Sequence, residues 1–343
     1  MVDERGGYRG RMRLPQPRGP VSSTVVAALA SGEPVPDIDV PASSEMLADE
    51  DLQLALWTAY QLHYAGYDDA PDAHEWEPGL VGLTVRIEEQ LLALLWEATA
   101  DRVRRAREAA DDVPDQIFAM LKDDDGPSLA SWLHRDADRA QYDEFLVQRG
   151  LLALKESDHA AWTLPRLRGP AKAVLAELLY DEFGGGRGDH VHSTLYASAL
   201  RASGLDDTLG GQVDAMPVEM LAVDNVGTFL ALHQRLRGAA LGHFAAFEAS
   251  SSLPCRRYAG GAERLGYPPE VVGYWDEHVE ADAVHEQLAV RGICGRLVAD
   301  DPALADDVLV GAAACLETET RWSAAVLTAF RAGRSSLRQE LGA

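Results

Sequence analysis

Two histidines and an aspartate, His278, Asp282 and His285, are spaced so that all three could bind one metal ion. At 3.6 residues per turn, positions i, i+4 and i+7 of an α-helix fall within about 60° of arc, so the three side chains share one stripe over two turns. Imidazole and carboxylate are donors that non-haem iron and manganese accept. The alternative is a solvated polar face, because several glutamates surround the three residues.

A second group of candidate ligands lies upstream, on either side of a glycine run. Glu182 precedes Gly184-Gly185-Gly186, and His192 follows the glutamate by ten residues. On one continuous helix that spacing would leave the two side chains about 80° apart, but the glycines break any such helix. Glu182 would then end one helix and His192 would begin the next, and the glycine backbone could approach a cofactor closely. An ordinary helix–turn–helix with exposed polar residues is the alternative.

Glu156 completes the set of candidate ligands. A glutamate near a helix end is most often exposed, so this residue gains meaning only together with the others. The set holds three carboxylates and three imidazoles: Glu156, Glu182, His192, His278, Asp282 and His285. Two divalent ions against three negative charges leave a net charge of roughly +1, whereas one ion would leave about −1 and face too many donors. The charge balance favours two metals.

The elements that must position these residues are helices. From residue 46 onward, apolar side chains recur at helical spacing, and alternating strand patterns are nearly absent. Helices are predicted over about 137–156, 170–183, 189–203, 217–253, 268–296 and 301–333, and further helices between 46 and 135. The sequence therefore predicts an all-α bundle in which facing helices supply the ligands.

Three regions follow from this pattern. Residues 1–45 are rich in Arg, Gly, Pro and Ser with little periodicity, so we expect a flexible N-terminal arm. Within it, residues 21–30 are too short for a membrane helix and lack a convincing cleavage site. Residues 46–135 are predicted to be a helical extension that packs on the bundle. Residues 136–335 are predicted to form the bundle itself.

The composition excludes several classes of partner. A net charge of −24 argues against nucleic acid, which needs a basic face, and against docking on a membrane of anionic lipid. The three cysteines, Cys255, Cys294 and Cys315, match neither a zinc motif nor a disulfide framework, so a cytoplasmic location is expected. A hydrophobic content of 47% with 25% charged residues is typical of a globular protein.

Several motifs resemble the haem-oxygenase-like diiron oxidase superfamily of iron-containing redox enzymes. They are Glu-Ser-Asp-His-Ala-Ala-Trp-Thr-Leu-Pro-Arg-Leu from Glu156, Tyr-Asp-Glu-Phe-Gly-Gly-Gly-Arg from Tyr180, Gly-His-Phe-Ala-Ala-Phe-Glu from Gly242, and His-x-x-x-Asp-x-x-His from His278. The likeness covers about residues 45–330. Matched residue by residue to the family pattern, it implies the metal ligands Glu156, Glu182, His192, His278, Asp282 and His285.

The resemblance also implies a fold, a cofactor and a class of reaction. The fold would be a haem-oxygenase-like up-down helical bundle with two iron ions between its core helices. The donors equally allow manganese in one site. O2 would be the co-substrate, and the substrate would be a small amine, amino acid or fatty-acid-like metabolite of secondary metabolism. The reaction would be N-oxygenation, desaturation or oxidative carbon–carbon cleavage, and it would draw on an external reductant.

Other residues near the proposed ligands are candidates for orienting them or contacting a substrate. Asp181 and Asp189 could hydrogen-bond the imidazoles. Glu248 lies in a strongly apolar helix, and because an unpaired buried carboxylate is costly, we expect it to act as a base, a substrate anchor or a further ligand. Aromatic residues could form a water-excluding pocket, although at helical spacing they more often belong to the core. The aromatic candidates are Tyr196, Phe244 and Trp275.

Three other interpretations stay open. A ferritin-like site would pair Glu156 with His159 and Asp282 with His285, but one motif would need Asp for Glu and two histidines would be spare. Haem-oxygenase-like bundles also include metal-free, thiaminase-like hydrolases with a cysteine nucleophile, for which Cys255 beside two arginines is the candidate. The third is a non-catalytic interaction protein of a biosynthetic cluster, in which the N-terminal helical region would serve docking or homodimerisation.

Overall fold

The computed structural model describes residues 11–126 and 128–341, except for the side chains of residues 280–283. Its α-helices are α1 (Pro20–Ser31), α2 (Glu50–Tyr60), α3 (Pro78–Ala109), α4 (Val113–Lys122), α5 (Leu129–Arg135), α6 (Arg139–Ala153), α7 (Asp158–Ala161), α8 (Gly169–Glu182), α9 (His192–Ala202), α10 (Val218–Leu232), α11 (Arg237–Leu265), α12 (Pro269–Gln287), α13 (Arg296–Asp300) and α14 (Ala305–Arg331). Because these residues contain no β-strand, the all-α prediction is confirmed. No helix in the described ranges is long and apolar enough to cross a membrane.

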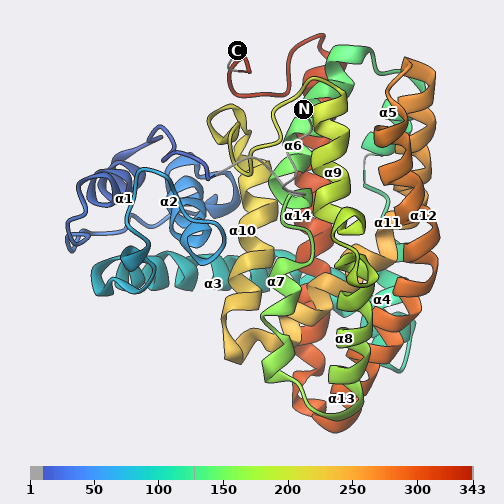
Figure 1. Cartoon of the computed structure of the whole chain (residues 1–343). Helices are drawn as coiled ribbons and strands as arrows, with labels where there is room; N and C mark the ends of the chain where they lie inside the picture. The colour runs from blue at the N-terminus through green and yellow to red at the C-terminus, as the bar shows by residue number, and fades with distance from the viewer. Residues whose placement is uncertain (1–10, 127, 342–343) are drawn as a thin grey trace.

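The helices form an upright bundle with a smaller lobe at one side (Figure 1). In the bundle, α11 packs against both α12 and α14. The lobe contains α1, α2 and the beginning of α3, and α2 packs against α10. Trp57 of α2 donates its indole N–H to Asp224 of α10 at 2.8 Å, and both groups are buried. The lobe is therefore joined to the bundle through a buried polar contact as well as apolar packing.

The structure differs from the flexible arm predicted for residues 1–45. The first ten residues lie outside the described part of the chain, but helix α1 follows. Its buried apolar side chains recur at every fourth position and form one face: Val21, Val25 and Leu29. Asp51 of α2 accepts hydrogen bonds from the main-chain N–H groups of Val21 and Ser22, at 2.9 and 2.7 Å. This partner is distant in sequence, so the composition of the segment alone could not reveal the helix.

The single helix predicted over 217–253 is also wrong, because the chain breaks between α10 and α11 at the 3-10 turn η8 (Gln234–Leu236). Arg166 donates to the main-chain oxygens of Ala231 and Leu232 at the end of α10. The last carbonyls of a helix have no partner within it, so these bonds stabilise the break. Residues 233–236 contain neither proline nor glycine, which is why helical spacing predicted continuity.

Two glycines set the close approach of α11 and α14. A Cβ atom on Gly242 would overlap the main-chain oxygen of Val308, and one on Gly311 would overlap that of Ala239. The two backbones therefore pack directly against each other, because no side chain separates them at this point. Glu248 lies further along α11, so this contact fixes the helix that carries it.

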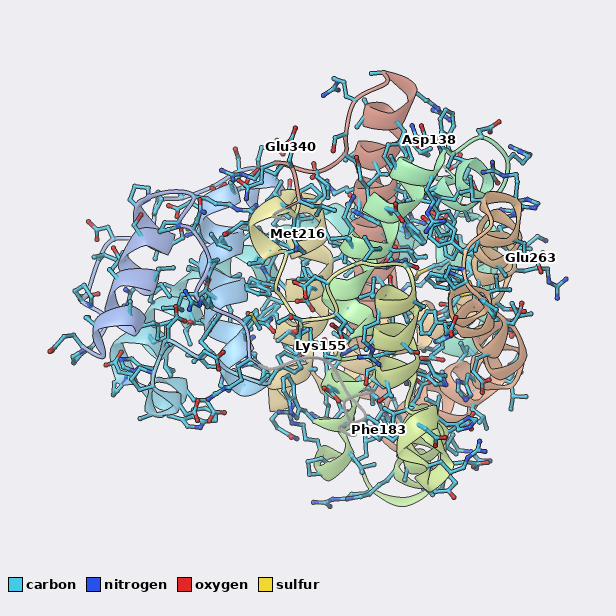
Figure 2. The ribbon with its side chains drawn as sticks, turned by 45° about the horizontal axis from the view of Figure 1, so that its top comes forward. Asp138, Lys155, Phe183, Met216, Glu263 and Glu340 are labelled. Carbon is cyan, nitrogen blue, oxygen red and sulfur yellow. The ribbon has the colours of Figure 1, made fainter. Side chains whose placement is uncertain are left out.

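Two clusters of buried apolar side chains form the core, and side chains fill the space between the helices (Figure 2). Along α12, Tyr274 and Trp275 belong to one cluster, and Ala289, just beyond the helix, belongs to the other. His278 and His285 lie between them and are buried. The polar residues therefore occupy a gap between two apolar regions and are largely shielded from water.

Candidate metal centre

Four segments bring the proposed ligands together: the turn after α6, the end of α8, the start of α9, and α12. Glu156 lies in the turn, Glu182 is the last residue of α8, and His192 is the first residue of α9. The loop between α8 and α9 depends on Gly184, whose φ is 78°. A Cβ atom there would lie 2.7 Å from the main chain of His190, so only glycine lets the loop fold back on itself.

The first triad consists of Glu156, His192 and His278, whose ligand atoms lie within 4.8 Å of one another. Nε2 of His278 is 3.4 Å from Oε2 of Glu156, and the hydroxyl of Tyr274 donates to the same oxygen at 2.8 Å. Nδ1 of His278 lies 2.8 Å from the main-chain oxygen of Tyr274. Because a carbonyl oxygen can only accept, Nδ1 carries a proton, and Nε2 is the ring nitrogen that faces Glu156.

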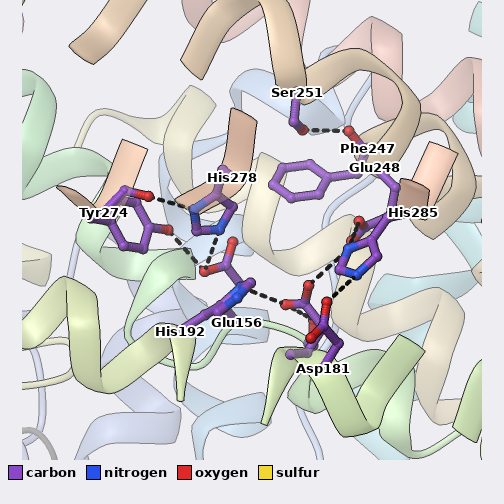
Figure 3. Close-up of polar contacts among 11 residues, drawn as sticks. Glu156, Asp181, His192, Phe247, Glu248, Ser251, Tyr274, His278 and His285 are labelled. Atoms are coloured by element: carbon purple, nitrogen blue, oxygen red, sulfur yellow. Dashed lines mark hydrogen bonds and ion pairs between the residues drawn. The ribbon is translucent and has the colours of Figure 1, made fainter. Parts of the chain in front are cut away.

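The second triad consists of Glu182, Glu248 and His285, all buried and with ligand atoms within 4.8 Å of one another. Nδ1 of His285 lies 3.2 Å from Oε2 of Glu248 and 3.3 Å from Oε1 of Glu182. Its Nε2 lies 2.8 Å from Oδ2 of Asp181. Asp181 therefore holds the imidazole with Nδ1 turned inward, as carboxylates do for metal-binding histidines. Figure 3 shows Asp181 and Glu248 on opposite sides of the His285 ring.

Glu182, a member of the second triad, also contacts the first. Its Oε1 faces His285 of the second triad, and its Oε2 is 3.1 Å from Nδ1 of His192 in the first. The hydroxyl of Ser157 donates to this same Oε2 at 2.8 Å. Ser157 has a φ of 64° and is the only non-glycine residue with a positive φ in the described part of the chain. Such a conformation costs on the order of 1–3 kcal/mol, and sequence reasoning did not single this serine out.

The two carboxylates and the imidazole of the second triad, together with His192 of the first, shift one another's pKa values. Burial disfavours the charged form of Glu182, but hydrogen bonds from His192 and His285 outweigh it and hold its pKa well below the usual range. Burial and the negative charge of Glu182 raise the pKa of Glu248 to about 7. Burial opposes the charge on His285, yet hydrogen bonds to the two glutamates raise its pKa to about 11. Without metal, Glu248 and His285 therefore hold protons at the place where a metal cation would bind.

The other predicted site residues are distributed differently. The backbone of Asp282 lies on α12 between the two histidines, but its side chain lies outside the described side chains. Asp189 is exposed in the turn between α8 and α9 and is not part of either triad. Tyr196 is buried, and its hydroxyl donates to a main-chain oxygen at 2.6 Å, as a core tyrosine does. Phe244 and Trp275 are buried and line cavities beside the triads.

The ferritin-like pairing of Glu156 with His159 is not formed. His159 belongs to neither triad, and its ring packs edge-on against that of His243 with the centroids 6.3 Å apart. Cys255 is buried on the wall of a cavity of about 470 Å³ that also reaches Glu156 and His278, which we call the outer cavity. The proposed nucleophile of a hydrolase therefore shares its surroundings with the first triad.

The all-α bundle and the two adjacent sets of carboxylate and imidazole donors define a helical protein equipped to bind metals such as iron. Residues 143–320 match the sequence model of a family described as iron-containing redox enzymes, and this stretch is slightly more than half of the 343-residue chain. The chain belongs to this family, so it is an oxidoreductase with a haem-oxygenase-like helical fold. The matched stretch contains every residue of both triads. No curated protein matches the chain.

Proposed function

We propose that the protein is a non-haem diiron oxidase or oxygenase that uses O2. The arrangement of the two triads around Glu182 carries this proposal, because one carboxylate contacts a histidine of each. The residues of each triad would hold one iron, and Glu182, which contacts a histidine of each triad, would help to hold both. Three carboxylates against two ferrous ions leave a net charge of roughly +1, which a buried site tolerates. Membership in the iron-containing family supports iron over a metal-free hydrolase.

The residues of the chain prepare this centre in several ways. The two irons would supply electrons for the reduction of O2, and an external reductant would restore them. Tyr274 and Asp181 fix the orientation of the two α12 imidazoles through hydrogen bonds at 2.8 Å. Ser157 orients the Glu182 carboxylate. Phe244 and Phe247 line the space beside Glu248 and limit the access of water to it.

The outer cavity supports a small metabolite as the substrate. Its volume of about 470 Å³ lies within the range of about 300–1,000 Å³ typical of small-molecule sites. Its wall includes Tyr258 and Trp275 together with Glu156 of the first triad. We propose that an amine, amino acid or fatty-acid-like compound binds here and undergoes N-oxygenation, desaturation or oxidative carbon–carbon cleavage. Arg149 on this wall is already paired with both oxygens of Glu319, at 2.7 and 2.9 Å.

Iron analysis of the anaerobically reconstituted protein tests the dinuclear site. We expect two irons per chain in the wild type. His278→Ala should lose the iron of the first triad, and Glu182→Gln should lose both because it removes the negative charge that the two triads share. Glu277→Gln, an exposed neighbour of His278 on α12, is the matched control and should retain both irons. One iron per chain at saturation in the wild type, or full loading of Glu182→Gln, would contradict the proposal. Elemental analysis of protein isolated without added metal would also detect manganese.

A separate measurement tests the use of O2. Ferrous protein prepared without oxygen should consume O2 on mixing, and the rate should follow the iron content of the sample. Glu182→Gln and the metal-free protein should consume O2 no faster than buffer containing the same free iron. Uptake by the loaded wild type that never exceeds this background, with a reductant and candidate amines and fatty acids present, would exclude an O2-dependent oxidase.

A further inference from the structure

A small cavity lies beside Glu156 and Glu248, one carboxylate from each triad. We call it the inner cavity; its volume is about 40 Å³. Residues of α7, α10 and α11 contribute to its wall. They include His159, Val223, Gly227, His243, Phe244 and Phe247. A cavity of this size has room for about three water-sized groups. Its wall also carries the paired Lys155 and Asp224, and Glu319, which pairs with Arg149, so the two imidazoles are set apart by belonging neither to an ion pair nor to a triad.

His243 has unmet hydrogen-bonding capacity. Its side chain is only 6% exposed, and neither ring nitrogen has a hydrogen-bond partner among the described residues. A buried polar atom without a partner is costly, and native proteins leave few of them. His243 is not a member of either triad. A ligand in the inner cavity would supply the missing hydrogen bonds.

The inner cavity favours an uncharged ligand. Lys155, buried near the centre of the molecule (Figure 2), pairs with Asp224 at 2.8 Å, so the two charges on this part of the wall compensate each other. Burial lowers the pKa of His159 to about 3 and that of His243 to about 4, so both imidazoles are neutral at physiological pH. A neutral imidazole offers one donor and one acceptor. The matching partner is a neutral group that both accepts and donates hydrogen bonds.

Gly227 of α10 keeps the inner cavity open. A Cβ atom at this position would lie 3.4 Å from Cε1 of His243 and 3.8 Å from the ring of His159. The first distance is at the close end of ordinary van der Waals contact, so the methyl group of an alanine would touch the His243 ring and occupy space beside it. The absence of a side chain at residue 227 thus preserves access to both histidines.

The inner cavity adjoins the outer cavity. Four residues contribute to both walls: Leu152, Glu156, Phe247 and Glu319. A compound in the outer cavity could therefore extend one end past Glu156 into the inner cavity. The part of the compound beside Glu156 would then lie next to the first triad.

We propose that the inner cavity is a subsite for one end of the substrate, an uncharged group such as a primary amide or a hydroxyl that hydrogen-bonds His243. The size of the cavity limits this end to about three or four non-hydrogen atoms. This assignment rests on the proposed function only in calling the ligand a substrate. The subsite selects against a carboxylate, because burying an unpaired charge costs far more than burying a neutral polar group.

Histidine NMR with acetamide as the probe tests the subsite. The full-length chain, labelled with ¹³C at Cε1 of its ten histidines, is titrated with acetamide and separately with acetate. The titrations are run without metal and with zinc, which is diamagnetic. His243→Phe assigns the key signal. We expect acetamide to shift the His243 and His159 signals saturably in both forms, and acetate to leave them unchanged. Acetate binding as tightly as acetamide, or no saturable shift with acetamide, would overturn the proposal.

Two glycine variants locate the binding. Gly227→Ala should weaken acetamide binding about tenfold, whereas Gly273→Ala should not change it. Gly273 lies in α12, and a Cβ atom there would meet nothing within 4 Å, so it is the matched control. Should Gly227→Ala fail to fold, His243→Phe serves instead and should abolish the shift at His159. Unchanged affinity in the folded variant would place acetamide elsewhere and refute the subsite.

Iron content, measured on the same preparations, separates the two proposals. Two irons per chain without acetamide binding would refute the subsite and leave the diiron proposal standing. Acetamide binding without iron loading would leave a neutral-ligand site but remove its assignment to an oxidase substrate.

Discussion

Iron binding should displace protons from the second triad, in a number that depends on pH. Nδ1 of His285 faces Glu182 and Glu248 and is the atom that would bind the metal, so its proton must leave. The pKa of His285 is raised to about 11, and that of Glu248 to about 7. Because both pKa values lie well above the usual ranges of histidine and glutamate, the number of protons released on iron binding reports on these two groups.

The expected numbers follow from these two pKa values. At pH 8 His285 is almost fully protonated and Glu248 is about nine-tenths ionised, so binding should release about one proton. At pH 6 Glu248 is about nine-tenths protonated as well, so binding should release about two. Hydrogen bonding to Glu182 also raises the pKa of His192, against the effect of burial. This histidine can only add to the number released at the lower pH.

Anaerobic titration calorimetry with Fe(II) measures this release. At each pH, the binding heat is compared in two buffers with different ionisation enthalpies, and the difference gives the protons taken up by the buffer. Glu248→Gln is the sharp control: it keeps the His285 proton but removes the group that titrates near pH 7. The variant should release about one fewer proton than the wild type at pH 6 and nearly the same number at pH 8. Equal release by the wild type at both pH values, or an unchanged increase in Glu248→Gln, would refute the place of Glu248 in the second triad.

Three further predictions concern the supports of the site. Ser157→Ala should weaken iron binding about 10–100-fold, because Glu182 loses the hydrogen bond that orients it. Competition with a chelator measures the affinity for iron. Ser157→Thr keeps the hydroxyl group and, if it adopts the same turn, should restore part of this affinity. Gly311→Ala should destabilise the fold by about 1–3 kcal/mol in urea unfolding, because its Cβ would overlap the main chain of α11, whereas Gly273→Ala, with open space around it, should not. Burial lowers the pKa of His243 to about 4, so between pH 7 and pH 5 the unfolded chain takes up a proton at this residue that the folded chain excludes. The free energy of unfolding should therefore fall by about 2 kcal/mol from this residue alone. A fall of equal size in His243→Phe would contradict this.

The parts of the site that the sequence predicted are those set by local geometry. His278 and His285 lie on one helix at a spacing that fixes their common direction, and the structure turns both toward carboxylates. The glycine run after Glu182 likewise indicated a break that could bring His192 back beside it, and the two residues lie 3.1 Å apart. Such inferences need only helix geometry and the conformational freedom of glycine.

The parts that were missed depend on partners distant in sequence. For Glu248 the sequence left three roles open (a base, a substrate anchor or a further ligand), because its place beside His285 follows from the packing of α11 on α12. The end of α10 is stabilised by Arg166, which lies more than sixty residues away along the chain. Helix α1 is capped by Asp51 of another helix. Composition and periodicity describe a segment by itself, so they contain no signal for these contacts.

Irregular backbone lies directly beside several of the proposed ligands. Ser157, with its left-handed backbone, directly follows Glu156, and the left-handed Gly184 comes two residues after Glu182. The π-helix η9 (Leu288–Gly295) begins three residues after His285. Regular helices in a bundle present side chains at fixed intervals along nearly parallel axes, which does not by itself direct six donors to two neighbouring points. The left-handed turns and the π-helix redirect the chain where convergence is needed, and their strain or poorer hydrogen bonding persists because the surrounding packing enforces it. Helix-spacing rules predicted the ligands on α12, but they do not describe the turn at Ser157, whose left-handed backbone is imposed by its surroundings.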